Sequence, residues 1–219
     1  MTELIPPQQP PSPQTKGTSK KVIFWIVFGL IIMMAGFSAL VIVAIYAQSE
    51  YIIDTKDKAV LVKAKDLRSF ITFTYNPSYE HYKKKWEYMD QTYTLSYEYE
   101  PKGEKLPILS SELVIHTSTG DAIIGEGLQW HGMGLGIKIV SAQVTTNNKI
   151  FKWGDSSRWG LISNKHGPIG NVFVARKGNK VFSMYIVGVY FADKKHASDF
   201  LLPTLKRLDT YKPSYKKKQ

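Results

Sequence analysis

The stretch that decides the fold is GNVFVARKGNKVFSMYIVGVYF, residues 170–191. It holds two apolar, β-branched and aromatic runs, 172–176 and 181–191, with Gly178-Asn179 between them. Glycine and asparagine tolerate positive φ, so a two-residue turn of this kind predicts a β-hairpin. The second run is apolar on both faces, which predicts a central strand that is covered on both sides.

A helix is predicted directly after the hairpin, in ADKKHASDFLLPTLKRL. Asp193 is its expected N-cap, and apolar residues then recur at helical spacing, at Ala197, Leu201, Leu205 and Leu208. Pro203 lies inside this pattern, and we expect it to kink or restart the helix.

A second hairpin is predicted upstream, because tyrosine and leucine alternate with polar residues from Tyr93 to Tyr99. Lys102-Gly103 forms its turn, and 108–116 runs back. A helix capped by Ser118 or Thr119 follows, although Gly125 and Gly127 weaken it. Short strands are predicted at 70–74, 137–145, 150–153, 159–163 and 169–176. These elements indicate an α+β fold, an antiparallel sheet with helices packed on it.

The clearest feature outside this domain is an uncharged apolar segment, Val22 to Ala47. Its 26 residues are enough to cross a bilayer core of about 30 Å. Trp25 and Tyr46 suit the two interfaces. The run is too long for a cleaved signal peptide, so we expect an uncleaved transmembrane helix.

Lysines on the amino-terminal side of the span favour a cytoplasmic amino terminus: Lys16, Lys20 and Lys21. Gly29 and Gly36 offer small contact points for weak self-association within the membrane. The expected order is a disordered proline-rich cytoplasmic tail at 1–21, the span at 22–47 and a juxtamembrane linker at 48–57. An extracytoplasmic α+β domain at 58–211 and a basic tail at 212–219 follow.

Composition limits the chemistry. The chain has no cysteine, which excludes disulfides, thiolate nucleophiles and cysteine-based zinc sites. Its net charge of +11 favours anionic partners, either lipid or an envelope polymer. Tyrosines and Trp86 are interleaved with Lys83, Lys84 and Lys85, a pattern that suits a sheet surface, an acidic membrane or a polymer. We do not expect nucleic acid as a partner.

FKWGDSSRWG, residues 151–160, places an acid, two hydroxyls and an arginine between two tryptophans and two glycines. It lacks the last glycine of a nucleophile elbow, since Arg158 stands there, and a turn built on Gly154-Asp155 explains it better. The glycine-rich GEGLQWHGMGLG, 125–136, is no phosphate loop, and we expect a flexible helix end that leads into a strand. No two histidines lie within ten residues, and the acids form no isolated pair that suggests general acid and base catalysis, so we expect no catalytic residue, metal or cofactor. If a ligand or partner is contacted, the expected residues are Trp130, His131, Trp153, Asp155, Arg158 and Trp159.

The order of elements from YEYE and LPILSSELVIH through STGDAI to the 170–191 hairpin and a closing leucine helix resembles the PsbP-like α/β/α domains, over about residues 58–211. This group includes bacterial lipoprotein domains of the LpqN and DcrB kind. The resemblance implies a non-enzymatic envelope or accessory domain and carries over no catalytic residues.

Three functions are therefore open. The first is a single-pass, membrane-anchored, non-catalytic envelope module that binds or supports another component. The second is a bitopic subunit of a membrane assembly such as a secretion or conjugation machine. The third is an enzyme whose site is assembled in space, which requires a polar pocket that joins residues such as His131, Asp155 and Arg158.

Overall fold

The computed structural model describes residues 51–87, 91–103, 106–139 and 142–214, and of 135–139 only the backbone. The predicted tail at 1–21 and the span at 22–47, with Val22, Trp25, Gly29, Gly36, Tyr46 and Ala47, lie outside these residues. So does the end of the basic tail. Among the helices that are described, none combines the length and the apolar character needed to cross a bilayer.

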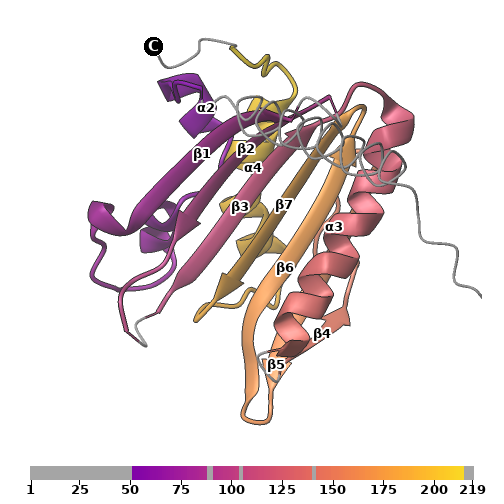
Figure 1. Ribbon diagram of the computed structural model, residues 1–219. Helices are drawn as coiled ribbons and strands as arrows, with labels where there is room; N and C mark the ends of the chain where they lie inside the picture. Colours follow the sequence, from indigo (N-terminus) through magenta and orange to yellow (C-terminus); the bar gives the residue numbers. More distant parts are fainter. Residues whose placement is uncertain (1–50, 88–90, 104–105, 140–141, 215–219) are drawn as a thin grey trace, which may run out of the picture. The chain divides into compact units, whose positions relative to one another are not determined.

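A seven-stranded antiparallel sheet forms the centre of the described part of the chain (Figure 1), and the predicted α+β class is confirmed. The strand order across the sheet is β1-β2-β3-β7-β6-β5-β4. The strands are β1 Glu80–Glu87, β2 Thr92–Tyr99, β3 Ile108–Ile115, β4 Gln143–Thr146, β5 Ser156–Asn164, β6 Gly167–Lys177 and β7 Lys180–Val187. The helices are α2 Thr55–Ala59, the 3-10 turns η1 Ala64–Ser69 and η2 Pro77–Tyr79, α3 Thr119–Ile139 and α4 Lys194–Leu208.

The predicted hairpin at the centre of the sheet is confirmed. Lys177 of β6 pairs with Lys180 of β7, which leaves Gly178-Asn179 as the turn, with Gly178 at φ 58°. β7 is the fourth strand of the sheet, between β3 and β6, and is buried over most of its length. It ends at Val187 instead of continuing to Phe191 as predicted.

Helix α4 begins where the sequence predicts, because the Asp193 side chain accepts a hydrogen bond from the His196 backbone N–H. Its predicted apolar face is buried. Of the kink or restart expected at Pro203, the restart is excluded, since one helix runs from Lys194 to Leu208 with the proline inside it. Burial of Leu201 and Leu205 on either side of Pro203 holds the helix on the sheet.

Helix α3 starts as predicted, with the Ser118 hydroxyl accepting a hydrogen bond of 3.1 Å from the Asp121 N–H. The prediction of a flexible helix end in 125–136 and of a strand that begins at 137 is wrong, because the helix extends to Ile139 and β4 begins at Gln143. Tertiary packing outweighs the low helix propensity of glycine here. Ala122, Trp130 and Met133 pack onto the sheet through Val174 and Val181.

Two other predicted strands, 70–74 and 150–153, are wrong, while β1 lies in the stretch of tyrosines and lysines whose pattern suits a sheet surface. The apolar residues in both segments pack against the core from irregular chain. Phe70, for example, lies edge-on to Phe191 and Phe200, with ring centroids at 5.2 and 5.7 Å. Apolar residues without strand pairing account for both errors.

The sheet has a helix on each face (Figure 1). Because successive strand residues point to opposite sides, each strand contributes side chains to both faces. The main core lies between the sheet and α4 with η1, and includes Tyr97, Phe173 and Phe182. A smaller cluster lies beneath α3 and includes Val174 and Val181. This layering decides which polar residues can meet.

Candidate functional site

The residues expected to contact a ligand or partner do not form one site. Trp159 is buried in the main core, with its ring 6.2 Å from Phe151 and 5.9 Å from Phe173. Trp153 packs against the same core, while Trp130 packs under α3 on the opposite face of the sheet. The set is therefore divided. Trp153 and Trp159 belong to the main core, Trp130 and the exposed His131 belong to α3, and the Arg158 guanidinium carbon lies 6.0 Å from the centroid of the Trp130 ring.

The Gly154-Asp155 turn lies where the sequence places it. The Asp155 carboxylate accepts hydrogen bonds from the Gly178 N–H at 2.8 Å and from the Arg176 guanidinium at 3.1 Å. Gly154 has φ 74°, and a Cβ on it would lie 2.3 Å from the Arg176 carbonyl oxygen. Asp155 thus fastens its turn to the neighbouring β6–β7 turn.

A buried glutamate on α3 completes a polar cluster that the sequence did not predict. Glu126 is 4% exposed and accepts hydrogen bonds from the Ser156 hydroxyl at 2.6 Å and from Arg176 Nε at 3.3 Å. Arg176 therefore joins two carboxylates, one on α3 and one on the turn before β5. Both Glu126 oxygens are occupied, so the cluster ties the helix to the sheet.

A second buried network lies at the opposite edge of the sheet. Lys84 Nζ is 2.6 Å from Asp57 Oδ2, and neither side chain exceeds 1% exposure. The Tyr211 hydroxyl donates to Asp57 Oδ1 at 2.6 Å and lies 2.9 Å from the Tyr93 hydroxyl. Burial and then the hydrogen bond to Asp57 raise the pKa of Tyr211. The segment that the sequence assigns to a linker, 48–57, therefore supplies a buried partner to the sheet.

Ser214 and Lys84 resemble a serine–lysine pair, with Nζ 3.1 Å from the hydroxyl. A lysine that activates a serine must accept a proton, whereas an ammonium has three donors and no acceptor. All three donors of Lys84 are used, by Asp57 Oδ2, the Ile52 carbonyl at 3.0 Å and Ser214. The contacts identify a structural tie between the two ends of the domain.

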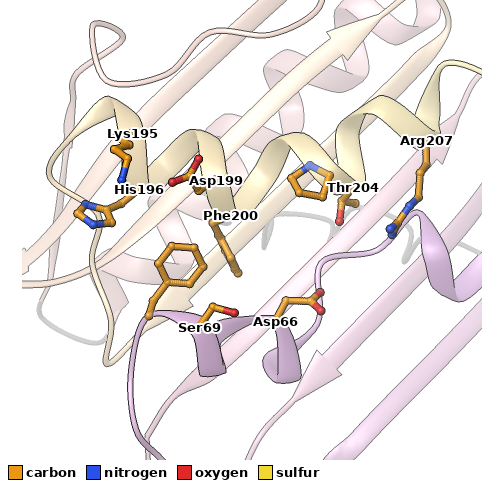
Figure 2. A pocket seen from close by; sticks show the side chains of 10 residues that line it. Asp66, Ser69, Lys195, His196, Asp199, Phe200, Thr204 and Arg207 are labelled. Carbon is orange, nitrogen blue, oxygen red and sulfur yellow. The ribbon is translucent and has the colours of Figure 1, made fainter.

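A hollow of about 600 Å³ lies between η1 and α4 (Figure 2). His196 contacts Asp193, and Ser69 lines the same hollow, so a hydrolase triad has to be considered. No hydrogen bond joins Ser69 to His196 in the described part of the chain. Phe70, the next residue after Ser69, has its ring 6.3 Å from the imidazole. Asp193 and His196 are half-exposed and cap α4, and their contact lowers the pKa of Asp193.

Two adjoining hollows near α2 are lined by cations. One of about 570 Å³ contains Lys58, Lys63, Lys65 and Arg207. The other, of about 490 Å³, shares Arg207 and adds Lys56 and Lys212. Burial lowers the pKa of Lys63, and the charges of Lys65 and Arg207 lower it further while Asp66 and Glu80 oppose them.

Glu80 lies at the rim of the first of these hollows, and three tyrosine hydroxyls donate to its carboxylate. Tyr75 and Tyr97 donate to Oε1 at 2.7 and 3.1 Å, and Tyr82 donates to Oε2 at 3.3 Å. Burial is the main cause that raises the pKa of each tyrosine, so all three remain donors at neutral pH. The acid is thus already satisfied by the protein.

The outer face of α3 exposes three large apolar side chains. Ile123, Ile124 and Leu128 are 55%, 64% and 69% exposed. Gly127 on the same helix has open space where a side chain would extend.

No group of three or more His, Asp or Glu side chains within 51–87, 91–103, 106–139 and 142–214 is arranged to hold a metal ion. No protein-family model, curated protein or solved structure matches this chain.

Proposed function

We propose that the chain is a single-pass membrane protein with a cytoplasmic amino terminus, and that its α+β domain is an extracytoplasmic, non-catalytic module that binds another envelope protein. The outer face of α3 carries the proposal. A helix on the surface of a domain normally has polar residues on its outer side. α3 instead exposes Ile123, Ile124 and Leu128 on consecutive turns.

The charge pattern of α3 favours a protein partner with an apolar surface. The chain carries 29 lysines and arginines, yet none lies between Thr119 and Ile137. Contiguous exposed apolar patches mark interaction sites. The bare backbone at Gly127 permits close approach by a partner, as small residues do in helix–helix contacts.

The two buried polar networks support a non-catalytic role. Glu126 and Asp57 each have both carboxylate oxygens occupied by donors from the protein. A general base must lie within hydrogen-bond reach of substrate, and these two carboxyl groups are only 4% and 1% exposed. These are the most buried charged groups of the described domain, and their contacts join elements together. The PsbP-like resemblance stays a prediction that agrees with this role.

A photo-crosslinking amino acid at Leu128 tests the proposal in intact membranes. The matched control carries the same amino acid at Lys206, which is exposed on α4. We expect one envelope protein to be captured from Leu128 and not from Lys206, with or without Met1 to Ser19. Equal capture from both positions, or none from Leu128, would contradict the proposal.

Capture of a second copy of the chain from Leu128 would favour the alternative function, a bitopic subunit of a membrane assembly. The two results are distinguished by the mass of the crosslinked product. A doubled mass indicates self-association, whereas any other mass indicates a different envelope protein.

A further inference from the structure

We propose that the cation-lined end of the domain docks onto acidic phospholipid headgroups of the membrane in which the chain is anchored. This end, called here the basic end, comprises Lys56, Lys58, Lys63, Lys65, Arg207 and Lys212. The inference rests on the membrane anchoring in the proposed function, and it does not depend on the partner that α3 binds.

The charges of the basic end are largely uncompensated. Six cations line its two hollows, and Glu80 is the one carboxylate among the lining residues described. The ion pairs of the described residues include none of the six cations. The Asp66 carboxylate lies close by and accepts from the Lys63 backbone N–H at 3.1 Å. Five of the six cations are exposed and Lys63 is half-buried, so the end presents net positive charge to solvent.

Several contacts hold these side chains in place. Arg207 donates to the Ala59 carbonyl at 3.1 Å, which joins the last turn of α4 to α2. Lys58 Nζ lies 4.7 Å from the centroid of the Tyr82 ring. The lowered pKa of Lys63 reflects, after burial, the proximity of Lys65 and Arg207. A polyanionic surface would relieve the repulsion within this cluster.

The chain connects the basic end closely to the predicted span. Only residues 48–50 separate Ala47 from Tyr51, and an extended chain covers at most about 3.6 Å per residue. Tyr51 donates its N–H to the Lys84 carbonyl, and Thr55 and Lys56, four and five residues further on, already line the hollows. A tether this short keeps headgroup phosphates at high local concentration near the basic end.

The carboxyl end of the chain leaves the domain beside the same network. Lys84 Nζ donates to Ser214 at 3.1 Å, and Ser214 donates to Asp54 at 3.3 Å. The sequence continues with three lysines, Lys216, Lys217 and Lys218. Positive charge near an acidic membrane contributes about 1 kcal/mol per lysine, a factor of about five. The hollows are shallow and adjoining, which suits a plane of phosphates.

The test uses the full chain reconstituted into nanodiscs. The chain has no cysteine, so Thr210→Cys in the second hollow carries a single fluorophore. A second reporter, His166→Cys, lies on the β5–β6 turn, just before β6 begins. The opposite end of β6 is Lys177, which forms an ion pair with Asp209 next to α4. Energy transfer to a headgroup-labelled lipid measures proximity. We expect transfer at Thr210→Cys to rise when acidic phospholipid replaces zwitterionic lipid, and to fall again in high salt. His166→Cys should report no rise.

A charge variant and its matched control decide the cause. Lys56, Lys58, Lys65 and Lys212 are changed to glutamine in one protein, and the exposed Lys102, Lys149, Lys152 and Lys165 in the other. Both lose four charges. We expect the ratio of docked to undocked domain to fall at least tenfold in the first variant and less than twofold in the second.

Two results would overturn the proposal. One is energy transfer at Thr210→Cys that does not change when acidic lipid is added. The other is an equal loss of docking in the two charge variants. Inorganic polyphosphate, added to zwitterionic nanodiscs, tests a soluble polyanion as the other source of phosphate. If polyphosphate binds while acidic lipid has no effect, the headgroup assignment fails. Crosslinking from Leu128 is read for both charge variants in intact membranes, so loss of docking is distinguishable from loss of partner binding.

Discussion

Three consecutive lysines on β1 have different environments, and the difference defines their roles. Lys83 is exposed, Lys85 pairs with Glu87 at 2.5 Å, and Lys84 is fully buried with Asp57. The alternation of a strand explains this, because Lys84 lies opposite Leu95 of β2, on the face that forms the main core. The same residue type is thus a surface charge at one position and a core group at the next.

Replacing Lys84 with methionine should lower the free energy of unfolding by about 3–5 kcal/mol, because Asp57 is left buried without its counterion. Urea unfolding of the detergent-solubilised chain, followed by tryptophan fluorescence, measures this. Lys83→Met is the matched control and should change stability by less than about 0.5 kcal/mol. Adding Asp57→Asn to Lys84→Met should recover part of the loss. Equal effects at positions 83 and 84 would mean that the ion pair is not buried.

Glu112 on β3 should make stability depend on pH. Burial raises its pKa above the ordinary 4.5, with Glu87 and Glu98 adding to the shift and Lys85 opposing it. The folded state therefore favours the protonated acid, so its stabilising effect is complete below pH 4.5 and is lost as pH rises through the raised pKa. Glu112→Gln should melt above the parent at pH 7 and together with it at pH 4. Exposed Glu100→Gln is the control, and an equal gain there would refute the assignment.

At the scale of elements, α3 is a helix that retains glycines on its surface. Gly127→Ala should stabilise the chain by about 0.5–1 kcal/mol, since a Cβ there meets no atom within 4 Å and alanine has the higher helix propensity. Gly154→Ala, a substitution of the same size, should destabilise by more than that, because its φ is positive and Arg176 blocks the Cβ. Thermal unfolding of both variants checks the signs. Loss of stability in Gly127→Ala would indicate that this face of α3 is already covered.

Elements with a strong local signal were predicted correctly. The β6–β7 and β2–β3 hairpins and α4 each combine a regular apolar period with a turn or cap, such as Gly178-Asn179 or Asp193. Where local chemistry and packing disagree, the prediction was wrong. Because of its glycines, α3 was predicted to be shorter than it is. The apolar chain at 70–74 packs on the core without pairing as a strand.

Neither polar network was predicted from the sequence. Lys84 meets Asp57 across 27 positions and Asp57 meets Tyr211 across 154, while Glu126 meets Arg176 across 50. No local period or motif in the sequence indicates contacts between residues that are so far apart along the chain. The predicted contact residues were chosen for aromatic and charged character, but adjacent strand residues such as Arg158 and Trp159 point to opposite faces. Only their alternation along the strand places the two side chains on different faces of the sheet.

On the scale of the whole molecule, different surfaces have different chemistry. Lys84, Asp57 and Ser214 hold both ends of the described chain at one edge of the sheet, next to the basic end. The outer face of α3 exposes Ile123, Ile124 and Leu128, and the helix has no lysine or arginine before Lys138. The proposed membrane contact and the proposed protein contact therefore use separate elements, and each can be removed without the other.

The proposed membrane contact and the proposed protein contact both depend on the predicted membrane topology. The uncharged 26 residues at 22–47 are expected to span the bilayer, and Lys16, Lys20 and Lys21 should keep the amino terminus in the cytoplasm. Single cysteines at Thr15 and Lys165 provide unique labelling sites in a chain without cysteine. A membrane-impermeant maleimide should label Lys165→Cys in intact cells, and Thr15→Cys only after permeabilisation. The reverse pattern would place the domain in the cytoplasm, and release of the chain by alkaline carbonate would exclude an integral span.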